Sequence, residues 1–123
     1  MFIIMKYIRI TCINNNKMNI PVPSSTIITV YSRPFCPNCE KCKVFLKDKH
    51  ISFTEVMLDV DDASYIINRD FLIEKTGNKH KTYPFVFVGD AFLGGYNEIV
   101  NAYATLKLHD LCAKAGITID HDF

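Results

Sequence analysis

Two cysteines, Cys36 and Cys39, stand where a strand-like segment gives way to a helical one, and this junction restricts the fold more than any other feature. Residues 27–31 form a β-branched run typical of a strand. Residues 37–49 are predicted to be helical, since their opening proline suits the first position of a helix. A second strand is predicted over residues 53–58. Because a helix connects these strands, they should be parallel with a right-handed crossover.

The second half of the chain continues the alternation of helices and strands. Asp61 and Asp62 can cap a helix that Gly77 can end. Segments 85–88 and 91–93 are predicted strands of a hairpin, because the Gly-Asp pair between them suits a type II′ turn. A last helical region follows, which gives the order β-α-β-α-β-β-α and predicts an α/β fold with a four-stranded mixed sheet flanked by helices. Apolar residues at helical spacing are Ala63, Ile66, Ile67 and Phe71 in the earlier helix and Leu108, Leu111, Cys112 and Ala115 in the last.

Length, charge and composition indicate one globular domain with additions at both ends. The chain has 123 residues, nearly half of them hydrophobic, and a formal net charge of +1. No basic run with interleaved aromatic residues is present, so we expect no nucleic-acid partner. The first residues are apolar but carry Lys6 and Arg9, and we expect neither a leader peptide nor a membrane span. A break rich in Asn and Pro predicts an extension over 1–23, a domain over 24–116 and a tail over 117–123.

The five cysteines are unevenly placed, with Cys36, Cys39 and Cys42 clustered and Cys12 and Cys112 alone. This odd number and this placement argue against a secreted disulfide scaffold and favour a reducing compartment, which we take to be the cytoplasm. A four-ligand zinc site would need a second paired motif, so we expect no metal. We expect Cys112 to be a buried, inert thiol and Cys42 a partly buried helix residue, with a regulatory thiol as the alternative for Cys42. The single histidines His50, His80, His109 and His121 are expected on the surface or in loops.

The position of Cys36 at a helix start suits thiol–disulfide exchange, which needs a reactive thiolate and a second thiol within reach. Unpaired amides and the helix dipole should lower its pKa from ~8.5 into the range ~3.5–7.5, and Arg33 can add to this. Cys39 lies one turn further on and can close a disulfide. Cys42 lies ~9 Å along the helix, beyond the ~7 Å that a disulfide tolerates. A chance pair and half of a zinc site stay open as alternatives.

Four motifs in order give the chain a specific resemblance to the glutaredoxins of the thioredoxin superfamily, over about residues 26–115. These motifs are YSRPFCPNC at 31–39, TYP at 82–84, the strand at 85–88 and GGYN at 94–97. The resemblance implies a thioredoxin-like fold, with Cys36 as the nucleophile and Cys39 as the resolving thiol of a redox-active disulfide. It also implies a glutathione site formed by Arg33, Lys81, Tyr83, Pro84, Gly95, Tyr96 and Asn97.

Each of these residues has an implied role. Arg33 stands where the family has a lysine that approaches the glycyl carboxylate of glutathione, and Lys81 (or Lys79) can add charge. Tyr83 would pair through its backbone with the cysteinyl part, beside a cis-proline at Pro84. The turn Gly95, Tyr96 and Asn97 would hold the γ-glutamyl end. Three departures stand out: Asn38 replaces a tyrosine, Asn97 replaces a frequent aspartate, and the segment 78–81 is about two residues longer than usual.

The function implied is that of a glutathione-dependent oxidoreductase that reduces protein disulfides and glutathione mixed disulfides and transfers electrons between thiols. Glutathione would be the reducing co-substrate, with no bound cofactor, and we expect a monomer. Two alternatives remain: a glutaredoxin-like protein reduced by thioredoxin reductase, and a carrier in which Cys36 and glutathione ligate an iron–sulfur cluster across a dimer. The presence of Cys39 favours disulfide chemistry. Phe35 can either shape the substrate surface or pack in the interior.

Overall fold

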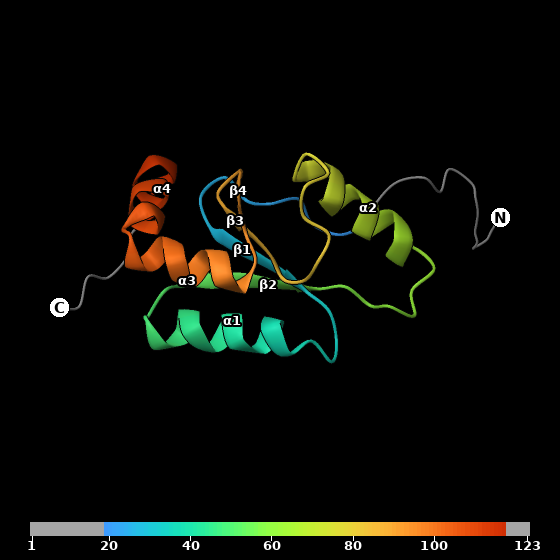
Figure 1. Cartoon of the computed structure of the whole chain (residues 1–123). Helices are drawn as coiled ribbons and strands as arrows, with labels where there is room; N and C mark the ends of the chain where they lie inside the picture. Colours follow the sequence, from blue (N-terminus) through green and yellow to red (C-terminus); the bar gives the residue numbers. More distant parts are fainter. Residues whose placement is uncertain (1–18, 118–123) are drawn as a thin grey trace.

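A four-stranded mixed sheet forms the centre of the computed structural model, which describes residues 19–117 (Figure 1). The strand order is β2-β1-β3-β4, with β1 parallel to β2 and antiparallel to β3, and β3 antiparallel to β4. The predicted α/β class with a mixed sheet flanked by helices is therefore confirmed. The elements are β1 (Ile28–Ser32), α1 (Pro37–Asp48), β2 (Phe53–Met57), α2 (Tyr65–Lys75), β3 (Phe85–Val88), β4 (Ala91–Gly94), α3 (Tyr96–Ala104) and α4 (Lys107–Ala115).

The central strands β1 and β3 are buried along their whole length because helices cover both faces of the sheet. Alternate residues of a strand face opposite sides. Ile28 and Val86 therefore pack with residues of α1, α3 and α4, whereas Tyr31 and Phe87 pack on the other face with Leu72 of α2. Figure 1 shows α1 and α3 together on one side of the sheet and α2 on the other.

The junction between β1 and α1 forms as predicted. Pro37 occupies the first turn of α1, and Cys36 is its N-cap residue. The helix ends at Asp48, close to the predicted end. Both Cys36 and Cys39 pack in the cluster on the α2 side of the sheet, so the start of α1 sits where the end of β1, α2 and the loop before β3 meet.

The second helix begins later than predicted, which corrects the capping role given to Asp61 and Asp62. The α2 helix starts at Tyr65, so Ala63 lies outside it. The carboxylate of Asp62 instead accepts a hydrogen bond of 2.7 Å from the backbone N–H of Ser64. Aspartate side chains that bond to the backbone two residues on favour turns over helix, and here they form a turn that precedes the helix.

The last helical region is two helices rather than one. The chain breaks between them at Leu106, which has a φ of +65°, and the hydroxyl of Thr105 donates to the carbonyl of Asn101 over 3.0 Å. The predicted apolar face of α4 is confirmed, with Leu108 and Cys112 buried.

The hairpin turn between β3 and β4 also forms as predicted, since Gly89 has a φ of +59°.

Residues 19–23 pack against the domain that follows them. The backbone N–H of Asn19 donates to the side-chain oxygen of Asn68 over 2.9 Å, and the Asn68 amide donates back to Asn19 over 2.7 Å. The Tyr31 hydroxyl donates to the carbonyl of Pro21 over 2.6 Å, and Pro23 is buried. The boundary between residues 23 and 24 stays a prediction. The rest of the extension, with Cys12, and the tail over 118–123 lie outside the described residues.

No helix within residues 19–117 has the length and apolar character needed to cross a membrane.

Candidate active site

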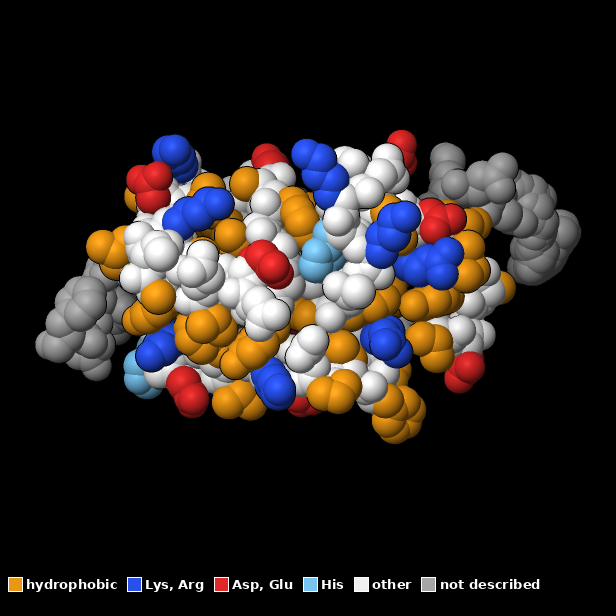
Figure 2. Space-filling model, in the orientation of Figure 1, with side chains coloured by type: hydrophobic (Ala, Val, Ile, Leu, Met, Phe, Trp, Pro, Cys, Tyr) orange, Lys and Arg blue, Asp and Glu red, His pale blue; other side chains and the backbone are white. Residues whose placement is uncertain are grey.

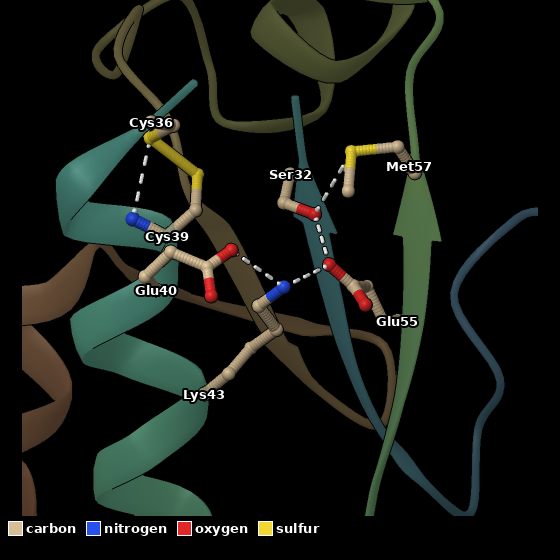
Figure 3. Close-up of polar contacts among 7 residues, drawn as sticks. All are labelled: Ser32, Cys36, Cys39, Glu40, Lys43, Glu55 and Met57. Carbon is tan, nitrogen blue, oxygen red and sulfur yellow. Dashed lines mark hydrogen bonds and ion pairs between the residues drawn. A yellow bond between two sulfur atoms is a disulfide. The ribbon is translucent and has the colours of Figure 1, made fainter. Parts of the chain in front are cut away.

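Cys36 and Cys39 are joined in a disulfide at the start of α1, with their Cα atoms 5.2 Å apart. This is the pairing that the helix spacing predicts. The Cys36 sulfur accepts a hydrogen bond of 3.2 Å from the backbone N–H of Cys39 (Figure 3). An amide at a helix start that points at a sulfur stabilises its thiolate once the disulfide is reduced. Cys36 is 6% exposed and Cys39 is 1% exposed, so Cys36 is the more accessible residue of the pair.

The other described cysteines lie in the core on the opposite face of the sheet. Cys42 is fully buried, which corrects the expectation of partial burial, because the face of α1 that carries it packs on the sheet. Burial raises the pKa of the Cys42 thiol to about 12, although Lys43 acts in the other direction. Burial also raises the pKa of Cys112 to about 11, as suits the predicted inert thiol. Both stay protonated at neutral pH and cannot act as nucleophiles.

A cavity of about 420 Å³ opens beside Cys36 and carries three positively charged side chains in its wall. These come from three separate segments: Arg33 from the β1–α1 loop, Arg69 from α2, and Lys81 from the loop before β3. Figure 2 shows Lys and Arg side chains gathered over α2 and the space between it and the start of α1. The cavity is suited to an anionic ligand that reaches Cys36. Its wall is completed by Asn38, Tyr65, Thr82 and Tyr83.

Tyr83 is buried beside this cavity. The guanidinium carbon of Arg33 lies over its ring, 5.4 Å from the ring centroid. The hydroxyl of Tyr83 donates to the hydroxyl of Tyr65 over 3.1 Å. Burial, followed by this hydrogen bond, raises the pKa of Tyr83, so its hydroxyl stays neutral. The peptide bond between Tyr83 and Pro84 is cis, as the resemblance implies. The sequence reasoning missed Tyr65 and Arg69, whose spacing of four residues on α2 is the signal that both share one face.

The turn over Gly95, Tyr96 and Asn97 does not line this cavity. Tyr96 instead borders a groove of about 350 Å³ between α1 and α3, where the ammonium of Lys41 lies 6.0 Å from its ring. Asn97 is exposed. Gly95 is buried, and its N–H donates to the carboxylate of Glu98 over 2.7 Å. The structure thus brings Arg33, Lys81 and Tyr83 together with Cys36, while this turn stands apart from the cavity.

A network of charged residues lies next to the disulfide, one turn further along α1 (Figure 3). The ammonium of Lys43 contacts the carboxylates of Glu55 at 2.8 Å and Glu40 at 2.9 Å. The hydroxyl of Ser32 donates to Glu55 over 2.6 Å. Hydrogen bonds to Glu55 and then Glu40 raise the pKa of Lys43. Burial raises the pKa of Glu55, but hydrogen bonds from Lys43 and Ser32 outweigh it and leave that pKa below its usual value.

Across residues 19–117, the structure gathers no group of three His, Cys, Asp or Glu side chains that could hold a metal ion.

The family model described as Glutaredoxin matches residues 28–93, which is more than half of the chain. The chain belongs to the glutaredoxin family. The match runs from β1 through the cysteine pair and the Tyr83–Pro84 segment into β4, so it includes every element that forms the cavity.

Individual proteins agree with this assignment. The glutaredoxin-C2 of Arabidopsis thaliana is 33% identical over 96 residues, which cover 77% of this chain and 83% of that protein. The crystal structure of oxidized glutaredoxin 2 from Chlamydomonas reinhardtii is 32% identical, with a TM-score of 0.62 over 76% of this chain and 85% of that one. A buckwheat glutaredoxin–glutathione complex is 22% identical and superposes with a TM-score of 0.65, over 76% of this chain and 82% of that one. The predicted thioredoxin-like fold is therefore confirmed.

Proposed function

We propose that this glutaredoxin is a glutathione-dependent thiol–disulfide oxidoreductase that acts through Cys36 and Cys39. The single observation that carries the proposal is the cavity beside Cys36, whose wall holds Arg33, Arg69 and Lys81. Glutathione is a small peptide with a carboxylate at each end and a thiol on its central residue. A ligand of that kind can pair with these cations while its sulfur reaches the nucleophile. The buckwheat protein of the same fold crystallised as a complex with glutathione.

Reduction of a glutathione mixed disulfide requires only Cys36. Its thiolate attacks the glutathione sulfur, forms a Cys36–glutathione disulfide and releases the other partner as a thiolate. A second glutathione thiolate then attacks the sulfur of the bound glutathione. This step produces glutathione disulfide and regenerates the Cys36 thiolate. The net reaction consumes one free glutathione, whose sulfur replaces the released partner in the disulfide with the glutathionyl group.

Reduction of a protein disulfide uses both cysteines. Cys36 attacks one sulfur of the substrate and forms a mixed disulfide, and the other substrate sulfur leaves as a thiolate. The Cys39 thiolate then attacks the Cys36 sulfur and releases the reduced substrate. The Cys36–Cys39 disulfide that results is the state seen in the structure. Two glutathione molecules return it to the dithiol.

The roles of individual residues follow from their positions. Arg33, Arg69 and Lys81 would bind the carboxylates of glutathione, and the backbone of Tyr83 would pair with its cysteinyl part. Pro84 would shape this wall. The turn Gly95, Tyr96 and Asn97 does not line the cavity, but Gly95 lies close to the carbonyl of Pro84. From there the turn would contact the γ-glutamyl group of glutathione. Asn97 supplies a neutral hydrogen-bonding group there.

Phe35 supports protein disulfides as substrates. Its side chain is 99% exposed, so it does not pack in the interior, and its φ of +58° is a conformation that such a residue rarely adopts. Phe35 does not line the cavity, whereas any protein attacked by Cys36 must approach this neighbouring residue. We therefore assign Phe35 to contact with protein substrates.

We further propose that the enzyme acts as a monomer in the cytoplasm and transfers electrons there, since its free thiols Cys42 and Cys112 suit a reducing compartment.

Turnover of a glutathionylated peptide with different reductants tests the proposal. Glutathione with glutathione reductase and NADPH should support turnover by the wild-type protein and the Cys42→Ala control, and Cys36→Ser should abolish it. Efficient reduction by thioredoxin reductase, with no turnover on glutathione, would overturn the proposal in favour of a thioredoxin-like electron donor.

A further inference from the structure

The loop between α2 and β3 holds one of its residues, His80, in a fixed backbone position. Gly77 and Asn78 turn the chain with φ values of +73° and +62°. The hydroxyl of Thr76 then accepts a hydrogen bond of 3.2 Å from the backbone N–H of His80, and it donates over 2.7 Å to the carbonyl of Ile73 in α2. The end of α2 therefore fixes the direction from which the imidazole enters the site region.

The imidazole of His80 points at the backbone of Pro84. Its Nε2 lies 3.2 Å from the carbonyl oxygen of Pro84, and because a carbonyl can only accept, Nε2–H is the donor. The ring packs against two aromatic side chains, with centroid distances of 5.0 Å to Phe85 and 5.1 Å to Phe92. These contacts determine both the place and the tilt of the ring.

The same ring also borders Gly95. A Cβ atom at Gly95 would lie 3.3 Å from Cε1 of His80 and 3.4 Å from the carbonyl oxygen of Pro84. The imidazole, Pro84 and Gly95 are therefore in close mutual approach. Pro84 belongs to the segment proposed to pair with the cysteinyl part of glutathione, and Gly95 begins the turn proposed to contact its γ-glutamyl end. His80 thus contacts both segments, which also approach each other directly, without lining the cavity itself.

We propose that His80 is a positioning residue, which fixes the Pro84 segment against the Gly95 turn and so shapes the binding site proposed for the glutathionyl group. The inference rests on the proposed function and deepens it. His80 acts through the Pro84 carbonyl and the Gly95 backbone, and it contacts neither of the reacting sulfurs.

Steady-state kinetics with a glutathionylated peptide tests this role. His80→Ala removes the donor and the ring, whereas His80→Gln keeps an N–H donor near the position of Nε2. Loss of one hydrogen bond predicts a rise of about three- to tenfold in the KM for the glutathionylated peptide in His80→Ala. The kcat at saturating glutathione should stay within about twofold, because the nucleophile is untouched. In His80→Gln, the KM should return most of the way to the wild-type value.

A second histidine supplies the matched control. His50 is exposed just after the C-terminal end of α1 and has a φ of +58°, which asparagine tolerates. His50→Asn should therefore leave both KM and kcat unchanged.

A wild-type KM in His80→Ala would overturn the inference. So would equal losses in kcat and kcat/KM that follow a lowered melting temperature, with no rescue by glutamine. Absence of glutathione turnover in the wild-type protein would instead overturn the proposed function, and this inference with it.

Discussion

Tyr31→Phe removes one hydroxyl and tests whether residues 19–23 belong to the folded domain. The Tyr31 side chain is fully buried beside the active-site cysteines, and its hydroxyl donates to the carbonyl of Pro21 over 2.6 Å. Burial raises the pKa of Tyr31 to about 12, so it remains a donor at neutral pH. The ring keeps its edge-to-face contact with Phe87 in the variant, because the substitution changes only the hydroxyl.

The expected loss follows from the net contribution of one hydrogen bond. Pro21 is exposed and its carbonyl can bond to water in the variant, so the free energy of unfolding should fall by about 1 kcal/mol. That corresponds to roughly 4–8 °C in melting temperature for a domain of this size. Truncation before Ser24 removes this bond and the two between Asn19 and Asn68, and should lower the free energy of unfolding by about 2–4 kcal/mol.

A double-mutant cycle in urea, with all cysteines kept reduced, separates the two effects. Once Pro21 is absent, the buried hydroxyl of Tyr31 has lost its partner, so Tyr31→Phe should be neutral or stabilising in the truncated protein. If the substitution destabilises full-length and truncated proteins equally, the Pro21 bond is not its cause. If truncation leaves stability unchanged, residues 19–23 do not anchor the fold and the domain begins at Ser24.

Three further predictions concern the surroundings of the disulfide. Because folding lowers the pKa of Glu55, its pairing with Lys43 stabilises the protein above about pH 4.5, and this stabilisation is lost as the pH falls further. Glu55→Gln should therefore flatten the acid limb of a plot of melting temperature against pH. An unchanged acid limb would exclude this network as its source. Phe35→Asn keeps a residue that tolerates a positive φ, and it should lower kcat/KM several-fold for a folded protein disulfide but not for a glutathionylated peptide. Equal losses of kcat/KM on both substrates would contradict a role in protein contact. Iodoacetamide alkylation of Cys36 in the reduced protein should show an inflection below the free-thiol value of ~8.5, whereas one at or above that value would contradict stabilisation by the helix start.

Local chemistry explains which features could be predicted from the sequence. The cysteine pair, the proline that follows it and the β-branched run before it act over a few residues, so the sequence alone placed α1 and the disulfide correctly. The central strands were equally clear, because burial on both faces requires continuous apolar runs such as residues 85–88.

Features that depend on tertiary contacts were missed. The start of α2 was predicted too early because Asp61 and Asp62 suit a turn as well as a helix cap, and local pattern does not decide between them. Arg69 enters the cavity only because α2 packs across the sheet from α1, and Lys43 meets Glu55 only through the parallel pairing of β1 and β2. The full burial of Cys42 likewise depends on how α1 is rotated against the sheet.

The central claim is that Cys36 takes up the glutathionyl group, and a trapped adduct tests it most directly. Cys39→Ser, incubated with a glutathionylated peptide and no free glutathione, should hold one glutathionyl group, and peptide mapping by mass spectrometry should place it on Cys36. Cys42 and Cys112 should carry none, because both are buried and their pKa values are raised. An adduct on Cys42 or Cys112, or no adduct while the wild-type protein turns over, would contradict the account.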